Sequence, residues 1–557
     1  MTRTLRLLVL SALTLTLAAC QRDATVTLPK AELAVVNATG YTIEDESLKT
    51  FSTMIIDDGR VIAIGDANLA ANYSIEQTLD VQGKTVLPGL IDAHGHVSSL
   101  GKLRKTLDVA GVTSLDTTLS RIAAFESTLD DEDQWLLGRG WNQVLWEENR
   151  FPTREDIDAV VADRPVFLNR IDGHAAWANS KALELAGINS DTPNPMGGVI
   201  VRDDTGAATG VLVDSAMGIV NAVVPEPPES VQRDYLKTAM EELASLGITG
   251  VHDAGVTTLE VALYKSLADA GEMPIRVSAM LGGVPVLQDF DAPITGYAND
   301  LFEVTSVKLY ADGALGSRGA AMIQPYTDDP DNLGLLFADT ETMAGYISAA
   351  HQKGFAANIH AIGDAANQTV LDAFEAVREA GETGFNDRIE HAQVVTLQDI
   401  PRFKSLDVVA SFQPTHATSD MNMAEDRVGS QRILGAYAWQ RMLGNGVKMA
   451  AGSDFPVEKP EMFDGLFAAV TRQGKNGKPP SGWFPDQALS REQTLAAFTI
   501  WASRSVGQGD RIGQLTPGMW ADFIVTDRDY FEIPAEEIWQ IKTLETWVGG
   551  KQVYAAE

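Results

Sequence analysis

Short hydrophobic runs rich in β-branched residues alternate with longer amphipathic stretches through the middle of the chain. This pattern is typical of strands of a parallel sheet separated by helices. Eight runs are predicted strands, at residues 85–93, 247–253, 274–281, 305–311, 355–360, 388–391, 407–412 and 448–451. Eight successive βα units predict an α/β fold of the TIM-like (β/α)8 barrel type.

Strand-like alternation also marks both ends of the chain. Near the start it covers residues 32–36, 52–56 and 60–64, and near the end it covers 520–526 and 545–554. Neither end has enough strands to form a sandwich by itself. We therefore predict that residues 31–84 and 505–557 pair in a small composite β-sandwich domain, with the barrel at 85–504 between them.

Residues from about 104 to 240 interrupt the alternation of strands and helices, and they are predicted to form an insertion near the barrel mouth. They include the polar segments 138–142 and 172–177 and a predicted hairpin at 197–212. Three tryptophans, Trp141, Trp146 and Trp177, fall here. These tryptophans have two possible roles. They could line an apolar substrate pocket, or they could pack in a core, which is the commoner role of this residue type.

The first residues resemble a bacterial lipoprotein signal peptide. Arg3 and Arg6 precede an apolar stretch too short to span a bilayer, which ends in Leu17-Ala-Ala-Cys20. We expect residues 1–19 to be removed, Cys20 to be lipidated, and residues 20–30 to form a tether. Gln21 follows where an aspartate would favour the inner membrane, so we expect a cell-envelope protein on the outer membrane, facing the periplasm.

The composition is that of a globular enzyme-sized protein, with 557 residues and a net charge of −33. Removal of residues 1–19 would take two arginines away, which gives −35. Such a charge repels phosphate backbones, so nucleic-acid binding is excluded as a function. Cys20 is the single cysteine, which excludes an internal disulfide and a cysteine nucleophile elsewhere. The sequence does not fix the oligomeric state, and a homodimer is one arrangement that we consider.

Polar residues gather at the predicted carboxyl ends of the strands, where barrel enzymes build their active sites. Four of the eight histidines stand there, and an aspartate and a lysine accompany them: His94, His96, His360, His391, Asp454 and Lys308. His94 and His96 are two apart, so on a strand they point the same way and offer two imidazoles to one metal ion.

Each of these residues also has a structural interpretation. A histidine at a strand end often serves as a hydrogen-bonding group of the fold. Lys308 is able to reach the rim or to pair with Glu303 or Asp312, and Asp454 is able to cap the next helix. The six together favour a metal site, because so many independent coincidences are improbable.

The chain resembles the amidohydrolase superfamily, in its YtcJ-like branch, which includes N-substituted formamide deformylases. The resemblance runs from about residue 31 to the end of the chain. The matching segments are 87–96, 172–180, 307–313, 359–364, 388–391 and 452–456.

The resemblance implies two divalent metal ions. His94 and His96 would bind one together with Asp454, His360 and His391 would bind the second, and Lys308 would bridge them after carboxylation by CO2. Zinc suits this ligand set, which leaves iron, manganese and nickel open. Glu390 is a candidate to orient a ligand, although strand alternation relative to His391 favours a structural role.

The resemblance also implies a hydrolase for carbon–nitrogen bonds other than peptide bonds, in which metal-activated hydroxide attacks a small-molecule substrate. Suitable substrates are an N-acyl or N-formyl amine or a cyclic amide. Asp454 is expected to act as general base and His174 as a catalytic residue, with substrate contacts from Trp141, Asn142, Tyr310 and Arg318. His252 and His416 also lie near strand ends, but no ligand position is left for them. Two alternatives remain open: an envelope lipoprotein that binds a metal or ligand without turnover, and an isomerase or hydratase with the same centre.

Overall fold

The computed structural model describes residues 28–129, 135–148 and 150–557. Cys20 and the expected signal peptide lie outside the described residues. Among the residues described, no helix combines the length and the apolar character needed to cross a bilayer.

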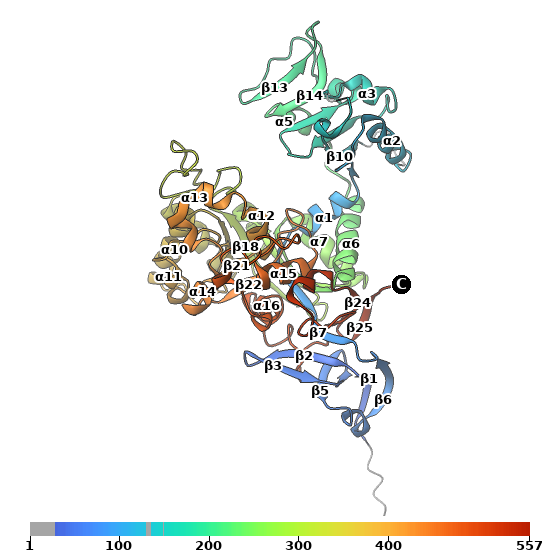
Figure 1. Cartoon of the computed structure of the whole chain (residues 1–557), viewed down its shortest axis with the longest axis vertical. Coiled ribbons are helices and arrows are strands. Elements are labelled where there is room, and N and C mark those ends of the chain that lie inside the picture. The colour runs from blue at the N-terminus through green and yellow to red at the C-terminus, as the bar shows by residue number, and fades with distance from the viewer. Residues whose placement is uncertain (1–27, 130–134, 149) are drawn as a thin grey trace, which may run out of the picture.

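A barrel of eight parallel strands forms the centre of the molecule, and it confirms the predicted fold class (Figure 1). Neighbouring strands are hydrogen-bonded in chain order, and a short antiparallel strand, β17 (Ile294–Tyr297), joins the outside of the fourth. The eight strands are β8 (Leu90–Gly95), β15 (Ile248–Val256), β16 (Arg276–Gly282), β18 (Phe302–Tyr310), β19 (Ala356–Ala361), β20 (Arg388–His391), β21 (Val409–Phe412) and β22 (Met449–Ala451).

Helices cover the barrel because each buries one apolar face against it. In α10 (Asp364–Glu379), for example, Val370, Leu371, Phe374 and Val377 recur at helical spacing and are buried. The other helices of this part are α1 (Val97–Arg104), α6 (Glu229–Ser245), α7 (Thr258–Asp269), α8 (Gly283–Leu287), α9 (Thr340–Gln352), α11 (Ile400–Ser405), α12 (Pro414–Asp420), α13 (Ala424–Arg432), α14 (Trp439–Gly444), α15 (Met462–Thr471), α16 (Arg491–Ala497) and α17 (Ile500–Ser505).

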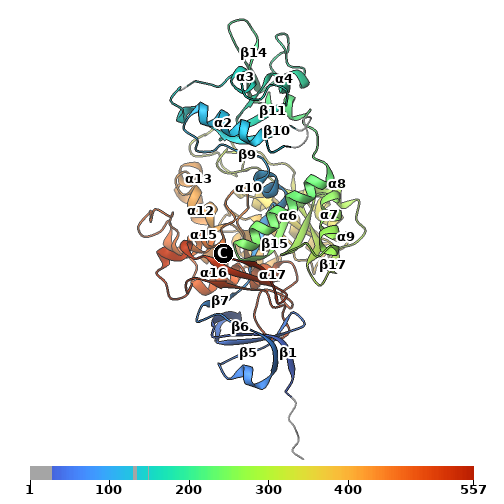
Figure 2. The same cartoon turned by 90° about the vertical axis from the view of Figure 1, so that its right-hand side faces the viewer.

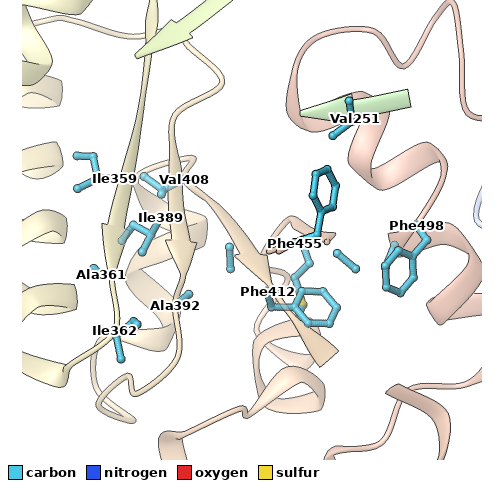
Figure 3. Packing of buried hydrophobic residues seen from close by; sticks show 14 of the residues in the cluster. Val251, Ile359, Ala361, Ile362, Ile389, Ala392, Val408, Phe412, Phe455 and Phe498 are labelled. Carbon is cyan, nitrogen blue, oxygen red and sulfur yellow. The ribbon is translucent and has the colours of Figure 1, made fainter. Parts of the chain in front are cut away.

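The barrel is closed between β22 and β8 by an irregular seam. The Asp454 N–H donates to the carbonyl of His94 at 2.7 Å, and the His96 N–H donates to the carbonyl of Phe455 at 2.8 Å. The buried carboxylate of Asp92 accepts from the backbone N–H and the hydroxyl of Ser453 at 2.9 and 2.6 Å. Phe455, which Figure 3 shows in the buried cluster, is fully enclosed beside this seam.

The two chain ends form one β domain below the barrel. One sheet has the order β5-β4-β1-β6, and the other, β25-β24-β23-β7-β2-β3, draws strands from both ends. The strands of the two sheets together are β1 (Lys30–Val36), β2 (Thr39–Glu44), β3 (Ser47–Phe51), β4 (Thr53–Asp57), β5 (Arg60–Gly65), β6 (Ser74–Asp80), β7 (Thr85–Pro88), β23 (Phe523–Thr526), β24 (Thr543–Val548) and β25 (Lys551–Ala555). Val35, Met54, Val86 and Phe523 are buried together between the sheets.

One predicted strand is two strands in the structure. Residues 85–93 were expected to form the first barrel strand, but β7 pairs with β23 in the β domain and β8 alone enters the barrel. Gly89 separates them at a point where a methyl group would lie 2.1 Å from the Thr249 hydroxyl. The apolar run is continuous because both strands are buried, so hydrophobicity alone does not reveal the break.

The insertion forms a separate lobe that stands off the barrel in both views (Figures 1 and 2). Its sheet has the order β13-β14-β12-β11-β10-β9. The elements are β9 (Leu107–Asp108), α2 (Leu115–Glu126), β10 (Leu136–Trp141), α3 (Arg154–Asp158), β11 (Val166–Arg170), β12 (Ala175–Ala178), α4 (Ser180–Leu185), β13 (Gly198–Arg202), β14 (Ala208–Asp214) and α5 (Met217–Asn221). The lobe ends near residue 221, since α6 packs against α1 on the barrel.

Candidate metal centre

Six side chains line a cavity of about 410 Å³ at the carboxyl ends of the barrel strands. They are the predicted ligands His94, His96, Lys308, His360, His391 and Asp454. Five strands or the loops that follow them supply these residues, because parallel strands all end at the same rim.

The donor atoms of one group are close enough to bind a single ion. Asp454 Oδ1 lies 3.2 Å from His96 Nε2 and 3.6 Å from His94 Nε2. A tetrahedral zinc ion with ligand bonds of about 2.0–2.2 Å requires donor atoms roughly 3.3 Å apart, so these separations suit it. Lys308 Nζ lies 3.0 Å from the same His94 Nε2, which places the amine at the edge of this group.

Three of the histidines are held in the tautomer that a metal needs. His94 Nδ1 contacts Glu390 Oε2 at 2.7 Å, His96 Nδ1 contacts the carbonyl of Ala254 at 2.9 Å, and His391 Nδ1 contacts the amide oxygen of Gln413 at 2.8 Å. Because each partner accepts, the proton of each ring resides on Nδ1 and Nε2 keeps its lone pair. The residues therefore fit a metal site.

His360 and His416 differ from the expected arrangement. His360 Nε2 faces Asp312 Oδ1 at 3.4 Å and the carbonyl of Gly313 at 3.5 Å. The second compact group of potential ligands consists of His391, His416 and Asp454. The ring of His416 stacks on that of His391 at 5.9 Å, and its Nε2 lies 3.6 Å from Asp454 Oδ2.

His416 belongs to the cavity although no role was expected for it. It lies on α12, directly after β21, so the strand-end rule that pointed to the other ligands also applies to it. The resemblance left no ligand position for this residue. The structure adds it to the candidate site, with a buried Nε2 atom that forms no hydrogen bond with the part of the chain that the structure describes.

Glu390 orients His94, and the expected structural role of this residue is wrong. Strand alternation placed it opposite His391, but His391 has a φ of 73° and no longer follows the strand. The carboxylate therefore points into the barrel towards His94, while Arg388 Nε donates to Oε1 at 2.9 Å. Burial opposes its ionisation, but Arg388 and His94 hold the pKa of Glu390 well below its ordinary value.

Burial sets the protonation states of the candidate ligands. It lowers the pKa of His94 to about 4 and that of His360 to about 3, and nearby Lys308 contributes to both shifts. Burial also lowers the pKa of Lys308 to about 8. At neutral pH the two imidazoles are unprotonated, and about a tenth of the Lys308 amine is neutral, far more than for a lysine with its ordinary pKa.

Of the expected substrate-contacting residues, Tyr310 alone lines the cavity. Arg318 instead binds Asp328, with Nε at 3.2 Å and Nη2 at 2.9 Å from the carboxylate. The prediction that Arg318 contacts substrate finds no support in this geometry, because its guanidinium is already engaged.

The three expected contacts from the insertion do not reach the cavity. Trp141 is fully buried in the core of the lobe, where its ring packs near Trp146 and Trp177. Asn142 caps a turn by accepting from the N–H of Val144, and His174 is exposed and contacts Asp214 at 2.9 Å. The described geometry does not bring Trp141, Asn142 or His174 to the cavity, and the contacts of these side chains lie within the lobe.

Comparisons with known proteins agree with this geometry. A family model described as "Amidohydrolase family" matches residues 77–554. The putative amidohydrolase YtcJ of Bacillus subtilis is 31% identical over 92% of this chain and 98% of its own length. N-substituted formamide deformylase of Arthrobacter pascens is 29% identical over 93% of this chain and 97% of its own. The crystal structure of an uncharacterized metal-dependent hydrolase from Pyrococcus horikoshii matches with a TM-score of 0.76 and 29% identity, over 90% of this chain and 99% of that one. The chain therefore belongs to the amidohydrolase family, in its YtcJ-like branch.

Proposed function

We propose that this protein is a metal-dependent hydrolase that cleaves the C–N bond of a small N-acyl or N-formyl amine or of a cyclic amide. The observation that carries the proposal is the convergence of imidazole, carboxylate and amine groups in one cavity at the carboxyl ends of the barrel strands. Its relatives YtcJ and N-substituted formamide deformylase carry names of this chemistry. The alternative of a lipoprotein that binds a metal or ligand without turnover is less favoured, because all six expected ligand positions carry a residue able to bind a metal.

The residues would hold two divalent ions, for which zinc is our first choice. His94, His96 and Asp454 would hold one, and His391 would hold the other with His360, although the described geometry offers His416 at that place. Neutral Lys308 would add CO2 and lose a proton, which gives a carbamate whose oxygens bridge the ions. Such ions, when bound, polarise a carbonyl group and lower the pKa of bound water to about 7.

The side chains of the chain supply the proton transfers and the orientation. Asp454 faces the cavity between His96 and His416, so its carboxylate is placed to take a proton from the attacking water and to pass it to the leaving nitrogen. If His360 and not His416 binds the second ion, a proton on Nε2 of His416 would let this ring donate to the substrate carbonyl. The balanced reaction converts an amide and water into a carboxylic acid and an amine.

Release of an amine tests the function directly. Metal-loaded protein is incubated with a panel of N-formyl amines, N-acyl amines and cyclic amides, and new primary amine is measured with a fluorogenic reagent. We expect amine release that Asp454→Asn abolishes. An isomerase or hydratase would release none, and full metal content without amine from any amide would contradict the proposal.

We also propose that a lipid on Cys20 anchors the protein to the cell envelope, on the outer membrane facing the periplasm. The proposal rests on the arginine-led apolar stretch and on the Leu17-Ala-Ala-Cys20 sequence. Labelling of growing cells with a palmitate analogue tests it. We expect incorporation in the natural protein and none in Cys20→Ser, and equal labelling of both would contradict the proposal.

A further inference from the structure

Beyond the candidate ligands, the cavity is lined by apolar and by acidic side chains. Tyr310, Leu315 and Ile362 supply largely apolar surface, and Asp420 and Glu458, here called the acidic wall, supply two carboxylates. Among the described residues that line the cavity, Lys308 is the one lysine or arginine, and it is buried among the candidate ligands.

Asp420 is held in a fixed orientation with one oxygen free. The Tyr437 hydroxyl and the Gln393 amide donate to the same atom, Oδ2, at 2.6 and 3.1 Å. The Gln393 amide also donates to the Tyr437 hydroxyl at 2.6 Å, and both partners are buried. Oδ1 receives no donor from the described residues, so it remains available to a ligand.

Asp420 forms no ion pair with a lysine or arginine among the described residues. Burial raises its pKa above the ordinary value, although the Tyr437 hydroxyl and nearby His416 oppose this shift. Glu458 accepts from the Ser419 hydroxyl at 2.6 Å, which turns its carboxylate to the same wall. Two carboxylates fixed by neutral donors at a cavity wall leave negative charge without compensation.

Arg318 and Arg427 are not among the residues that line the cavity, and both are engaged elsewhere. Arg318 and Arg427 both bind the carboxylate of Asp328, so their charges are neutralised there. An anionic substrate group would therefore meet Asp420, Glu458 and Asp454, and among the described residues that line the cavity only the buried Lys308 is a lysine or arginine. The net charge of −33 adds a general attraction for cations and repulsion of anions.

We propose that Asp420 and Glu458 bind a positively charged nitrogen of the substrate, so that the preferred substrates are N-formyl or N-acyl derivatives of diamines. This inference rests on the proposed amide hydrolysis and specifies its substrate class. The scissile amide lies at the candidate ligands, and the second nitrogen reaches the acidic wall of the same cavity.

Three substrates of nearly equal size separate the charge effect from the size effect. They are N-formyl-1,4-diaminobutane, N-formylpentylamine and N-formyl-4-aminobutanoate, which carry a cationic, neutral and anionic end. We expect kcat/KM to fall by about tenfold or more from the cationic to the neutral substrate, the effect of one charge-assisted hydrogen bond. It should fall again for the anionic substrate. Equal values for the cationic and neutral substrates would overturn the inference.

Substitutions of Asp420 and Glu458 test whether these two residues cause the preference for the cationic substrate. Glu458→Gln should lower kcat/KM about tenfold for the cationic substrate and leave the neutral one within about twofold, since one charge-assisted contact is lost. Glu458→Lys should raise kcat/KM for the anionic substrate above that for the cationic one. Asp420→Asn should act like Glu458→Gln, and Glu341→Gln, at an exposed position of α9, is the matched control with no effect. An unchanged preference in Glu458→Gln and Glu458→Lys would contradict the assignment.

Binding of the amine products separates this inference from the proposed hydrolysis. Calorimetry with 1,4-diaminobutane, a dication at neutral pH, and pentylamine, a monocation, compares two ligands that differ by one positive charge on the metal-loaded protein without turnover. Tighter binding of the diamine, weakened in Glu458→Gln and by added salt, supports the acidic wall even if no amide is hydrolysed. Equal affinities would overturn the inference even if hydrolysis is observed.

Discussion

Glu390 is the single residue whose position most clearly connects the barrel core to the candidate metal centre. Its carboxylate lies between His94 and Arg388, and all three side chains are fully buried. Glu390→Gln keeps the shape but removes the charge that orients His94, so we expect metal affinity or activity to fall about 10–100-fold. Titration of the metal-free protein with zinc measures this.

The matched control for this variant is Glu375→Gln, which removes an exposed carboxylate that pairs with Arg402 on the outer surface. Glu375→Gln should bind metal like the natural protein. Full metal affinity in Glu390→Gln, with an unchanged melting temperature, would show that Glu390 does not orient a ligand.

Lys308 gives the candidate centre a defined pH dependence. With a pKa of about 8, the neutral amine fraction rises about tenfold per pH unit below pH 8 and levels off above it. Only the neutral amine adds CO2, so at a fixed concentration of dissolved CO2 the rate of reactivation of metal-free protein by zinc should follow this curve. Reactivation that is independent of both pH and CO2 between pH 6 and 9 would contradict carboxylation of Lys308.

Most of the candidate ligands could be predicted from the sequence because they stand at or just after the end of a recognisable strand, as His94 and His360 do, whereas Lys308 lies within one. Two kinds of residue could not. Glu390 was misplaced because the left-handed backbone of His391 breaks the alternation on which the prediction relied. Trp141 and His174 were expected at the cavity but do not line it, because a motif does not reveal that its segment folds as a separate lobe.

The seam between β22 and β8 shows how an element boundary positions the ligands. A methyl group on Gly452 would lie 2.5 Å from the backbone nitrogen of His94 and 2.6 Å from Asp92 Oδ1. Gly452→Ala must therefore displace the backbone that carries His94. We expect a loss of about 1–3 kcal/mol in unfolding free energy and a lower metal content, measured by thermal unfolding and elemental analysis.

Gly444→Ala is the matched control for the seam. Gly444 is the last residue of α14, and nothing lies within 4 Å of the position that its methyl group would occupy. This change should be neutral or stabilise by up to about 1 kcal/mol, because alanine favours helix. Equal effects of the two changes on metal content would show that the seam does not position His94.

At the level of elements, the barrel strands could be predicted from periodicity, but the division of residues 85–93 could not. Both β7 and β8 are fully buried, so the apolar run continues across Gly89. The sheet to which each half belongs is decided by its partners, β23 and β15, which lie far away in the sequence.

The whole molecule is held together by contacts between the barrel and the β domain. Arg276 on β16 donates to Asp522 through Nε at 2.6 Å and Nη2 at 2.9 Å, and both side chains are buried. Arg276→Met leaves the buried Asp522 charge without its partner, so we expect a loss of about 3–5 kcal/mol, seen as a lower unfolding midpoint.

Arg233→Met is the matched control, since Arg233 pairs with Glu272 at the surface. It should cost less than about 1 kcal/mol, because exposed ion pairs contribute little. Similar midpoints for the two variants would contradict the role of Arg276 in joining the domains. The two-domain arrangement itself was foreseeable from the strands at both ends, whereas this buried contact depends on the folded arrangement of distant residues.

Metal analysis of the natural protein and of Lys308→Ala tests the central claim most directly, with Lys551→Ala on the exposed β25 as control. We predict about two metal ions per chain in the natural protein and in the control. Lys308→Ala should lose at least one ion and nearly all amide hydrolysis, because the bridging group is gone. Full metal content together with full activity in Lys308→Ala would contradict a two-metal centre bridged by this lysine.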